Sequence, residues 1–333
     1  MPNQCERIRS ISEYAASSTE LSRVYQRLAA HYTALAEKES VEMYRRLDPN
    51  RPQLIQILKI CLEQGLLTEL RQLVFVTTAY FDRQGYWAEL RDIHNMELTA
   101  ARLLGDRAYE GWCLQKLGSI YKKHRSDGMN DLIKALKLYE QSLAIAQDMG
   151  DKKREGVIMS SIAAIYDDCH DYNEALRLYK QSLEIMREFN DLESESSVLN
   201  SIATIEYSLC DYESALYYLK QSMLLVKDDK VGEGAILNNL AAIYCAQGNY
   251  DKAIEHHEQA LAIWQKLGDR GGEAESCWNI GITCVNTGDL AKVVEYMSRA
   301  VQIAKVIDHP SFKQWQERLA WIRLILVTEL GKW

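Results

Sequence analysis

Proline is scarce in this sequence of 333 residues, and its scarcity favours long helices. The four prolines stand at positions 2, 49, 52 and 310. A proline in the interior of a helix removes a backbone donor and clashes with the preceding turn. No residue of that kind interrupts the chain between Pro52 and Pro310, so the sequence permits continuous helix formation there.

Long apolar runs and paired cysteine motifs are also missing. The first ten residues, MPNQCERIRS, contain no apolar stretch typical of a signal peptide. The most apolar late segment, 321–327, is too short to cross a membrane. The eight cysteines form no CxxC pair, and most fall within helical periodicity, where a free thiol behaves as a small apolar group. We therefore expect a cytoplasmic protein without disulfides or a membrane segment.

Sequence motifs of common enzymes are absent as well. There is no GxxxxGK[ST] phosphate loop, no GxSxG and no HExxH. The segment 167–171 (DDCHD) has side chains of metal-ligand type, but its place between two expected helices favours an ordinary polar turn. We predict no catalytic residues, no metal site and no cofactor.

The charge balance limits the range of partners. The formal net charge is −8, which disfavours nonspecific binding to nucleic acid, because phosphate contacts need many Lys and Arg side chains. Apolar residues make up 47% and charged residues 26%, as in soluble folded proteins. We expect a protein or peptide partner, and neither nucleic acid nor membrane.

An internal repeat dominates the sequence. Five segments align: LGSIY (117–121), SIAAIY (161–166), SIATIE (201–206), NLAAIY (239–244) and NIGITC (279–284). A second small or apolar position, one helix further on, recurs in steps of 40, 40, 38 and 40 residues at Ala135, Ala175, Ala215, Ala253 and Val293. The segment 122–131 carries an insertion of five residues relative to the other turns.

The pattern predicts pairs of helices. In each first helix an apolar residue precedes a small one, and an aromatic ring usually follows on the same helical face. The small residues are expected to let the second helix approach closely, at Gly118, Ala163, Ala203, Ala241 and Gly281. Gly-Asp at 105–106, 150–151 and 268–269 would end one helix in the left-handed conformation and begin the next.

This pattern resembles the tetratricopeptide repeat (TPR), in the long variety of about 40 residues found in spindle-orientation adaptors and in the sensor regions of STAND proteins. The resemblance covers about residues 66–306. It implies an all-α fold, a right-handed α-α superhelix or TPR solenoid, that works as a binding platform. We expect an N-terminal helical cap or bundle at 1–65, with helices near 4–16, 19–47 and 51–64. The solenoid would occupy 66–306, as one divergent and five clear repeats, followed by a C-terminal capping helix within 307–333.

The first helices of such repeats line the concave face, so the ligand should meet residues just before the apolar position of each first helix. The candidates are Gln115, Lys116, Ser160, Asn200, Asn238, Asn239, Trp278 and Asn279. Amide side chains both donate and accept hydrogen bonds, which suits binding to an extended peptide. The alternative is a solvated, unused polar face. Basic residues around Lys116 and the insertion could receive an acidic ligand, although a solvated turn would explain them too.

The final helix, 311–331, is apolar on more than one side. Trp315, Trp321 and Ile325 are candidates for an interface with a partner or with a second copy, because exposed apolar patches often mark interfaces. The alternative is a wider contact with the last repeat.

Together these features predict a protein-interaction scaffold or adaptor that binds a peptide or helical segment of a partner. A regulatory sensor that changes its superhelix on binding a peptide or small ligand is the first alternative. An accessory subunit of an enzyme complex is the second.

Overall fold

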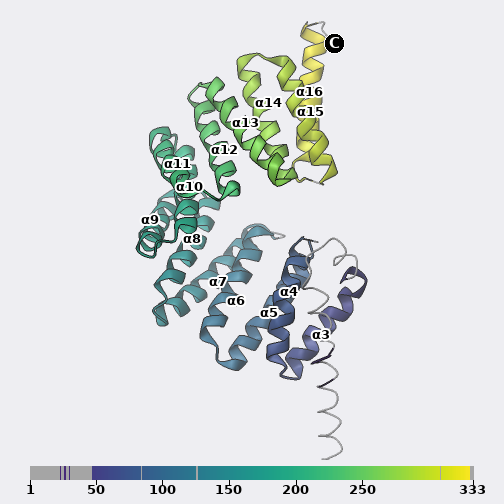
Figure 1. Ribbon diagram of the computed structural model, residues 1–333, viewed down its shortest axis with the longest axis vertical. Coiled ribbons are helices and arrows are strands. Elements are labelled where there is room, and N and C mark those ends of the chain that lie inside the picture. The colour runs from purple at the N-terminus through teal and green to yellow at the C-terminus, as the bar shows by residue number, and fades with distance from the viewer. Residues whose placement is uncertain are drawn as a thin grey trace, which may run out of the picture. The chain divides into compact units, whose positions relative to one another are not determined.

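The computed structural model describes residues 47–83, 85–124, 127–307 and 309–330, together with Arg23, Gln26, Arg27 and Ala30. The chain forms two compact units, Met1–Ile165 and Tyr166–Trp333. Within the described residues the secondary structure is helical, with no strand (Figure 1). The all-α prediction is confirmed.

The first unit is a succession of helices, each packed against the next from α3 to α7. A short 3-10 helix, η1 (Asp48–Asn50), leads into them. They are α3 (Arg51–Glu63), α4 (Leu67–Arg83), α5 (Trp87–Leu104), α6 (Arg107–Lys123), α7 (Met129–Asp148) and the start of α8 (Lys152–Asp168). The helix expected at 51–64 is confirmed as α3. The helices expected near 4–16 and 19–47 lie outside the continuously described residues.

The second unit continues the same helix-turn-helix pattern. Its helices are α9 (Tyr172–Glu188), α10 (Leu192–Ser208), α11 (Tyr212–Leu225), α12 (Lys230–Ala246), α13 (Tyr250–Leu267), α14 (Arg270–Thr287), α15 (Leu290–Val306) and α16 (Phe312–Leu330). The pairs α10/α11, α12/α13 and α14/α15 are in close contact, and α16 packs on α15. The division at 1–65, 66–306 and 307–333 and the handedness of the superhelix remain predictions.

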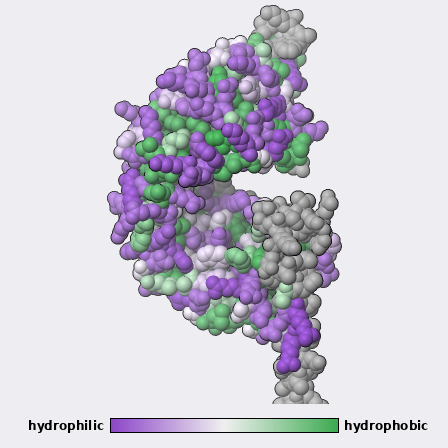
Figure 2. Space-filling view, in the orientation of Figure 1, coloured by the Kyte–Doolittle hydropathy of each residue, from purple (hydrophilic) through white to green (hydrophobic). Residues whose placement is uncertain are grey.

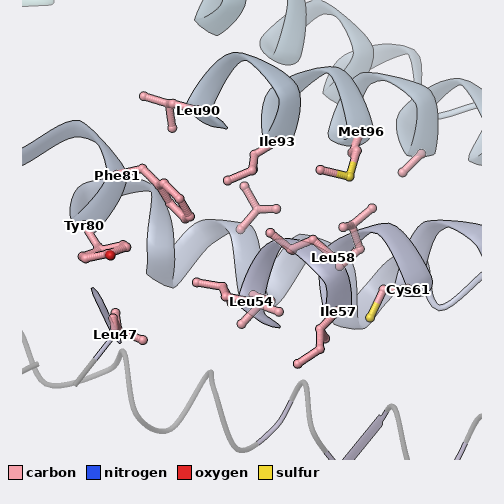
Figure 3. Close-up of a cluster of buried hydrophobic side chains, with 14 of the residues drawn as sticks. Leu47, Leu54, Ile57, Leu58, Cys61, Tyr80, Phe81, Leu90, Ile93 and Met96 are labelled. Atoms are coloured by element: carbon pink, nitrogen blue, oxygen red, sulfur yellow. The ribbon is translucent and has the colours of Figure 1, made fainter. Parts of the chain in front are cut away.

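A buried apolar cluster joins α3 to the divergent pair α4/α5 (Figure 3). Leu54 and Leu58 of α3 are fully buried, as are Tyr80 and Phe81 of α4 and Ile93 of α5. Burial of apolar side chains is the main stabilising contribution to such contacts. Helix α3 therefore shares one core with the divergent repeat.

The helix boundaries have the predicted chemistry. Gly105 and Gly268 end α5 and α13 in the left-handed conformation, with φ of 67° and 71°. The side chains of Asp106 and Asp269 accept hydrogen bonds from the backbone N–H groups of Tyr109 and Gly272 and so begin the next helices. The Gly-Asp prediction is confirmed at these turns.

Close approach at the small residues is confirmed where glycine occupies the site. A Cβ atom added to Gly118 would lie 2.8 Å from the ring of Tyr139 on α7. Separations below 3.0 Å force a neighbour to move. Gly118 is thus required by the contact between α6 and α7.

The predicted insertion divides between a turn and a helix. The connection from α6 to α7 spans 124–128, whereas 169–171 joins α8 to α9, so two extra residues lie in the connection. Ala135 is the seventh residue of α7, but the equivalent Ala175 is the fourth residue of α9, so three more residues lengthen the helix. The repeat resumes its normal register at Ala135.

A recurrent glutamate, which the sequence reading did not single out, ties successive helices together. It stands four residues after the capping aspartate, for example at Glu110 and Glu273. Glu110 accepts from Arg102 of α5 at 2.9 Å and from Arg107 at 2.7 Å. Glu273 accepts from Arg270 and from Arg299 of α15, both at 2.6 Å.

Candidate functional site

The predicted ligand residues lie on first helices of the repeats. In the first unit Gln115 and Lys116 belong to α6 and Ser160 to α8; in the second unit the remaining candidates belong to α10, α12 and α14. Their side chains differ in exposure: Lys116 is exposed, Trp278 is buried, and the others are half-buried. Figure 2 shows that the visible surface is mostly hydrophilic, with smaller hydrophobic areas between.

In the second unit two of the predicted amides form a pair. Asn239 Nδ2 of α12 donates to Asn200 Oδ1 of α10 at 2.8 Å. A carboxamide has two donor hydrogens and an acceptor oxygen, so each side chain has capacity beyond this one bond. The pair spans two neighbouring first helices, and both residues are half-buried.

Asn238, next in the chain to Asn239, has a different environment. Its Oδ1 lies 2.9 Å from Nδ1 of His257 on α13, and its Nδ2 donates to Ser276 Oγ on α14 at 3.2 Å. His257 is buried, and this burial, with the nearby His256, lowers the pKa of His257 to about 4. The neutral imidazole donates to the amide oxygen. Asn238 therefore links three helices.

Two tryptophans predicted for different roles pack on each other. The rings of Trp278 on α14 and Trp315 on α16 are stacked, with centroids 4.8 Å apart and planes at 7°. Trp278 is 5% exposed and Trp315 is 8% exposed. Docking of α16 on the last repeat accounts for both rings, and neither ring offers a free surface. Asn279, beside Trp278, is half-buried.

Trp321 and Ile325 lie elsewhere on α16. Trp321 is 63% exposed, and both residues line an apolar pocket of about 360 Å³. Val285 of α14 and Met297 of α15 line the same pocket. Trp321 is therefore an exposed apolar side chain of the final helix, beside an apolar pocket.

A larger open pocket of about 1020 Å³ lies in the first unit, between α4, α5 and α6, with one residue from α8. Of the predicted candidates it contains Lys116. Its lining includes Arg71, Phe75 and Asp82 of α4, His94 and Glu97 of α5, Asp106, Tyr109, Trp112, Lys116 and Lys123 of α6 and its N-cap, and Arg154 of α8. Ligand pockets commonly measure about 300–1,000 Å³, so this pocket has the size of a binding site.

A stack of aromatic rings and cations crosses this pocket. The rings of Tyr109 and Trp112 are nearly parallel, with centroids 5.5 Å apart and planes at 15°. The guanidinium carbon of Arg71 lies 3.9 Å from the centroid of Tyr109, and Nζ of Lys116 lies 5.4 Å from that of Trp112. Cations near aromatic faces are attracted by the ring quadrupole. Each ring thus has its own cation.

Two carboxylates that line the pocket, Glu97 and Asp106, accept hydrogen bonds from other lining residues. Glu97 accepts from the Tyr109 hydroxyl and contacts Nδ1 of His94 at 2.6 Å. Burial, followed by the hydrogen bond to Glu97, raises the pKa of Tyr109, so its hydroxyl stays protonated and donates. Asp106 caps α6 by accepting from the N–H of Tyr109 at 3.0 Å.

The candidates predicted from the sequence begin at Gln115 and do not include Arg71 or Phe75. Both lie on α4, in the divergent repeat, which is not part of the alignment of the five clear repeats. A signal was present, because Phe75 falls off the buried stripe of α4 that includes Leu70, Leu73 and Val74. A large ring outside the apolar stripe of an amphipathic helix has no core position to fill.

None of the described helices is both long and apolar enough to cross a membrane. Within the same residues no group of three or more His, Cys, Asp or Glu side chains is placed to hold a metal ion.

Paired helices at a regular interval, with polar and aromatic side chains on their first helices, define a helical-repeat scaffold. The sequence profile of the tetratricopeptide repeat matches residues 128–188, 154–225 and 233–305, which together make up half of the chain. The protein therefore belongs to the tetratricopeptide repeat family. No protein of curated function matches the sequence.

Solved structures share the fold at low sequence identity. BtubC (BKLC) from P. vanneervenii is 24% identical, with a TM-score of 0.57 over 67% of this chain and 92% of that protein. Aspartyl phosphate phosphatase F from Bacillus subtilis is 14% identical, with a TM-score of 0.58 over 92% and 90%. A Rap protein complexed with Competence and Sporulation Factor is also 14% identical, with a TM-score of 0.57 over 93% and 99%. These similarities establish the TPR solenoid fold.

Proposed function

We propose that this protein is a non-catalytic adaptor that binds a peptide or helical segment of a partner protein along the first-helix faces of its repeats. The observation that carries the proposal is the amide pair Asn200–Asn239, which joins two first helices and retains hydrogen-bonding capacity. An extended peptide backbone presents alternating donors and acceptors that such amides satisfy. The net charge of −8 favours a protein ligand over nucleic acid.

The fold similarities support a binding role. One structural neighbour is a Rap protein in complex with Competence and Sporulation Factor. Family membership supports it too, because the tetratricopeptide repeat forms a scaffold typical of protein–protein interaction. We place the protein in the cytoplasm, on the strength of its free cysteines.

The test is affinity purification from the native host with the doubly substituted variant Asn200→Ala/Asn239→Ala. We expect bound proteins recovered with the wild type to be lost or strongly depleted with this variant, as quantified by mass spectrometry. Gln259→Ala is the matched control, because it removes an exposed amide from the second helix α13. Unchanged recovery with the double variant, together with an unchanged circular dichroism spectrum, contradicts the proposal.

We further propose that the exposed part of α16 around Trp321 is a second contact surface, through which two copies of the chain associate. Its support is the 63% exposure of an indole beside an apolar pocket, since apolar patches of this kind often mark interfaces.

A further inference from the structure

The pocket of the first unit combines aromatic rings with cations in a way that defines a ligand chemistry. We propose that it binds a peptide segment in which acidic side chains flank an apolar side chain. This inference rests on the proposed function, because it names the ligand of one part of the first-helix surface.

The charges of the pocket favour an anionic ligand. Four Lys and Arg side chains and three Asp and Glu side chains are among its described lining residues. The three carboxylates already have partners: Asp82 pairs with Lys123 at 3.4 Å, Glu97 bonds to Tyr109 and His94, and Asp106 caps α6. Of the cations, Arg154 is held by Asp151 at 3.4 Å and donates to the carbonyl of Ala108 at 2.7 Å.

Two cations stay available for a ligand. Lys116 is exposed and has no ion-pair partner within the described part of the chain. Arg71 is paired with Asp106 at 3.8 Å, and its side chain is 56% exposed. A long, exposed ion pair of this kind contributes little and is readily exchanged. The lining therefore has one more positive than negative side chain, within a chain whose net charge is −8.

The apolar part of the ligand is indicated by Phe75. Its side chain is 81% exposed, the highest value among the described large apolar residues, and it lines the same pocket as Trp112. An apolar ligand side chain placed against Phe75 and Trp112 would remove all three from water, which is favourable. The rings of Phe75 and Trp112 therefore favour a ligand with an apolar side chain between its acidic side chains.

The size and the two cations distinguish a peptide segment from smaller anions. The volume of about 1020 Å³ admits several side chains at once. Arg71 and Lys116 lie on different rings of the stacked pair, so they match two carboxylates separated by an apolar group. A free C-terminus supplies one carboxylate, so acidic side chains within a segment fit the pocket better.

The test uses the full chain and three fluorescein-labelled peptides, acetylated at one end and amidated at the other so that no terminal charge contributes. Their sequences are Glu-Glu-Phe-Glu-Glu, Lys-Lys-Phe-Lys-Lys and Glu-Glu-Ser-Glu-Glu. Fluorescence anisotropy at low ionic strength should show the first peptide binding at least about tenfold more tightly than the other two. That factor corresponds to about 1.4 kcal/mol.

Variants locate the binding to this pocket. Lys116→Glu and Phe75→Ser should each weaken binding of the first peptide about tenfold or more. Lys137→Glu makes the same charge change at an exposed position of α7 outside the pocket and should change binding less than twofold. Circular dichroism of each variant checks that the fold is retained.

Equal binding of the lysine peptide, or full binding by Lys116→Glu, would overturn the inference. Binding more than tenfold tighter when phosphoserine replaces the glutamates would also overturn it, in favour of a phosphate site. If no peptide binds while Asn200→Ala/Asn239→Ala still abolishes partner recovery, this inference fails alone. If peptide binding behaves as expected and partner recovery is unaffected by the amide variant, the proposed role of the second unit fails alone.

Discussion

His257 donates a hydrogen bond from Nδ1 to Oδ1 of Asn238, across 2.9 Å and between α13 and α12. The bond lies in a buried position, where His257 is 3% exposed. An imidazolium at this place would be costly, because a buried charge loses its hydration. Burial therefore favours the neutral form of His257 in the folded chain.

The preference of the folded chain for neutral His257 predicts a loss of stability in mild acid. The pKa of His257 is lowered from 6.5 to about 4 in the folded chain, so the unfolded chain binds a proton first as the pH falls. Above pH 6.5 His257 is neutral in both states, and its full contribution to the free energy of unfolding is present. Between pH 6.5 and about 4 this contribution, about 3 kcal/mol, is lost. Urea denaturation at several pH values in this range measures it.

A matched pair of variants isolates the effect. His257→Gln should remove this part of the pH dependence. His256→Gln changes a half-buried neighbour whose charge is the smaller cause of the lowered pKa, so it should retain most of the pH dependence. The same slope of stability against pH in His257→Gln as in the wild type would show that another group is responsible.

Gly118→Ala should destabilise the protein, because the new Cβ would lie 2.8 Å from the Tyr139 ring. Overpacking of a core contact costs about 1–3 kcal/mol. Thermal or urea denaturation gives the difference. Lys137→Ala, at an exposed position of α7, is the control and should be nearly neutral. A neutral Gly118→Ala would mean that α6 and α7 can separate without cost.

Cys210→Gly should stabilise the protein. Cys210 has a φ of 63° at a turn where Gly248 occupies the corresponding position with a φ of 76°. The left-handed conformation costs a non-glycine residue about 1 kcal/mol, which glycine avoids. The free energy of unfolding is again the measurement.

The neighbouring turn supplies the control for this substitution. Cys169 is equally exposed but does not have a positive φ. Cys169→Gly should therefore give no gain, since glycine adds only chain entropy to the unfolded state there. An equal gain at Cys169 and Cys210 would point to loss of the thiol as the cause.

Substitution of the two tryptophans of α16 should change the free energy of unfolding by very different amounts. Trp315→Ala removes a buried ring stacked on Trp278 and should cost about 3–5 kcal/mol. Trp321→Ala changes an exposed ring and should alter stability by less than about 0.5 kcal/mol. Differential scanning fluorimetry followed by urea denaturation compares the two variants.

The same substitution, Trp321→Ala, also tests whether two copies of the chain associate. If two copies meet at α16, Trp321→Ala should shift the chain from dimer to monomer in sedimentation velocity at micromolar concentration. A monomeric wild type would contradict the proposed surface, and so would a dimer that Trp321→Ala leaves intact.

Local chemistry explains why so much of the fold was predictable. Gly105 ends a helix through its left-handed conformation, and Asp106 begins the next through a capping hydrogen bond. Both effects are local and do not depend on the rest of the chain. The small residue at Gly118 and the five-residue insertion follow from comparing repeats. Each repeat is nearly a copy of the next, so errors at one position are corrected by the others.

The site was less predictable, because adjacent residues on a helix point about 100° apart and the sequence does not state which one faces inward. Asn239 pairs with Asn200 on the first helices, whereas Asn238 bonds to His257 in the interior. Trp278 was expected to meet a ligand, but only the docking of α16 shows that Trp315 covers it. Phe75 and Arg71 belong to the divergent repeat, where no alignment guides the choice.

The longer connection 124–128 shows where this architecture tolerates added length. Five extra residues are taken up before Ala135, and the periodic contacts downstream keep their spacing. An epitope or a fluorescent reporter could therefore be introduced at this joint without shifting the phase of any later repeat. The same joint would let related chains gain or lose segments while every neighbouring helix keeps its partners.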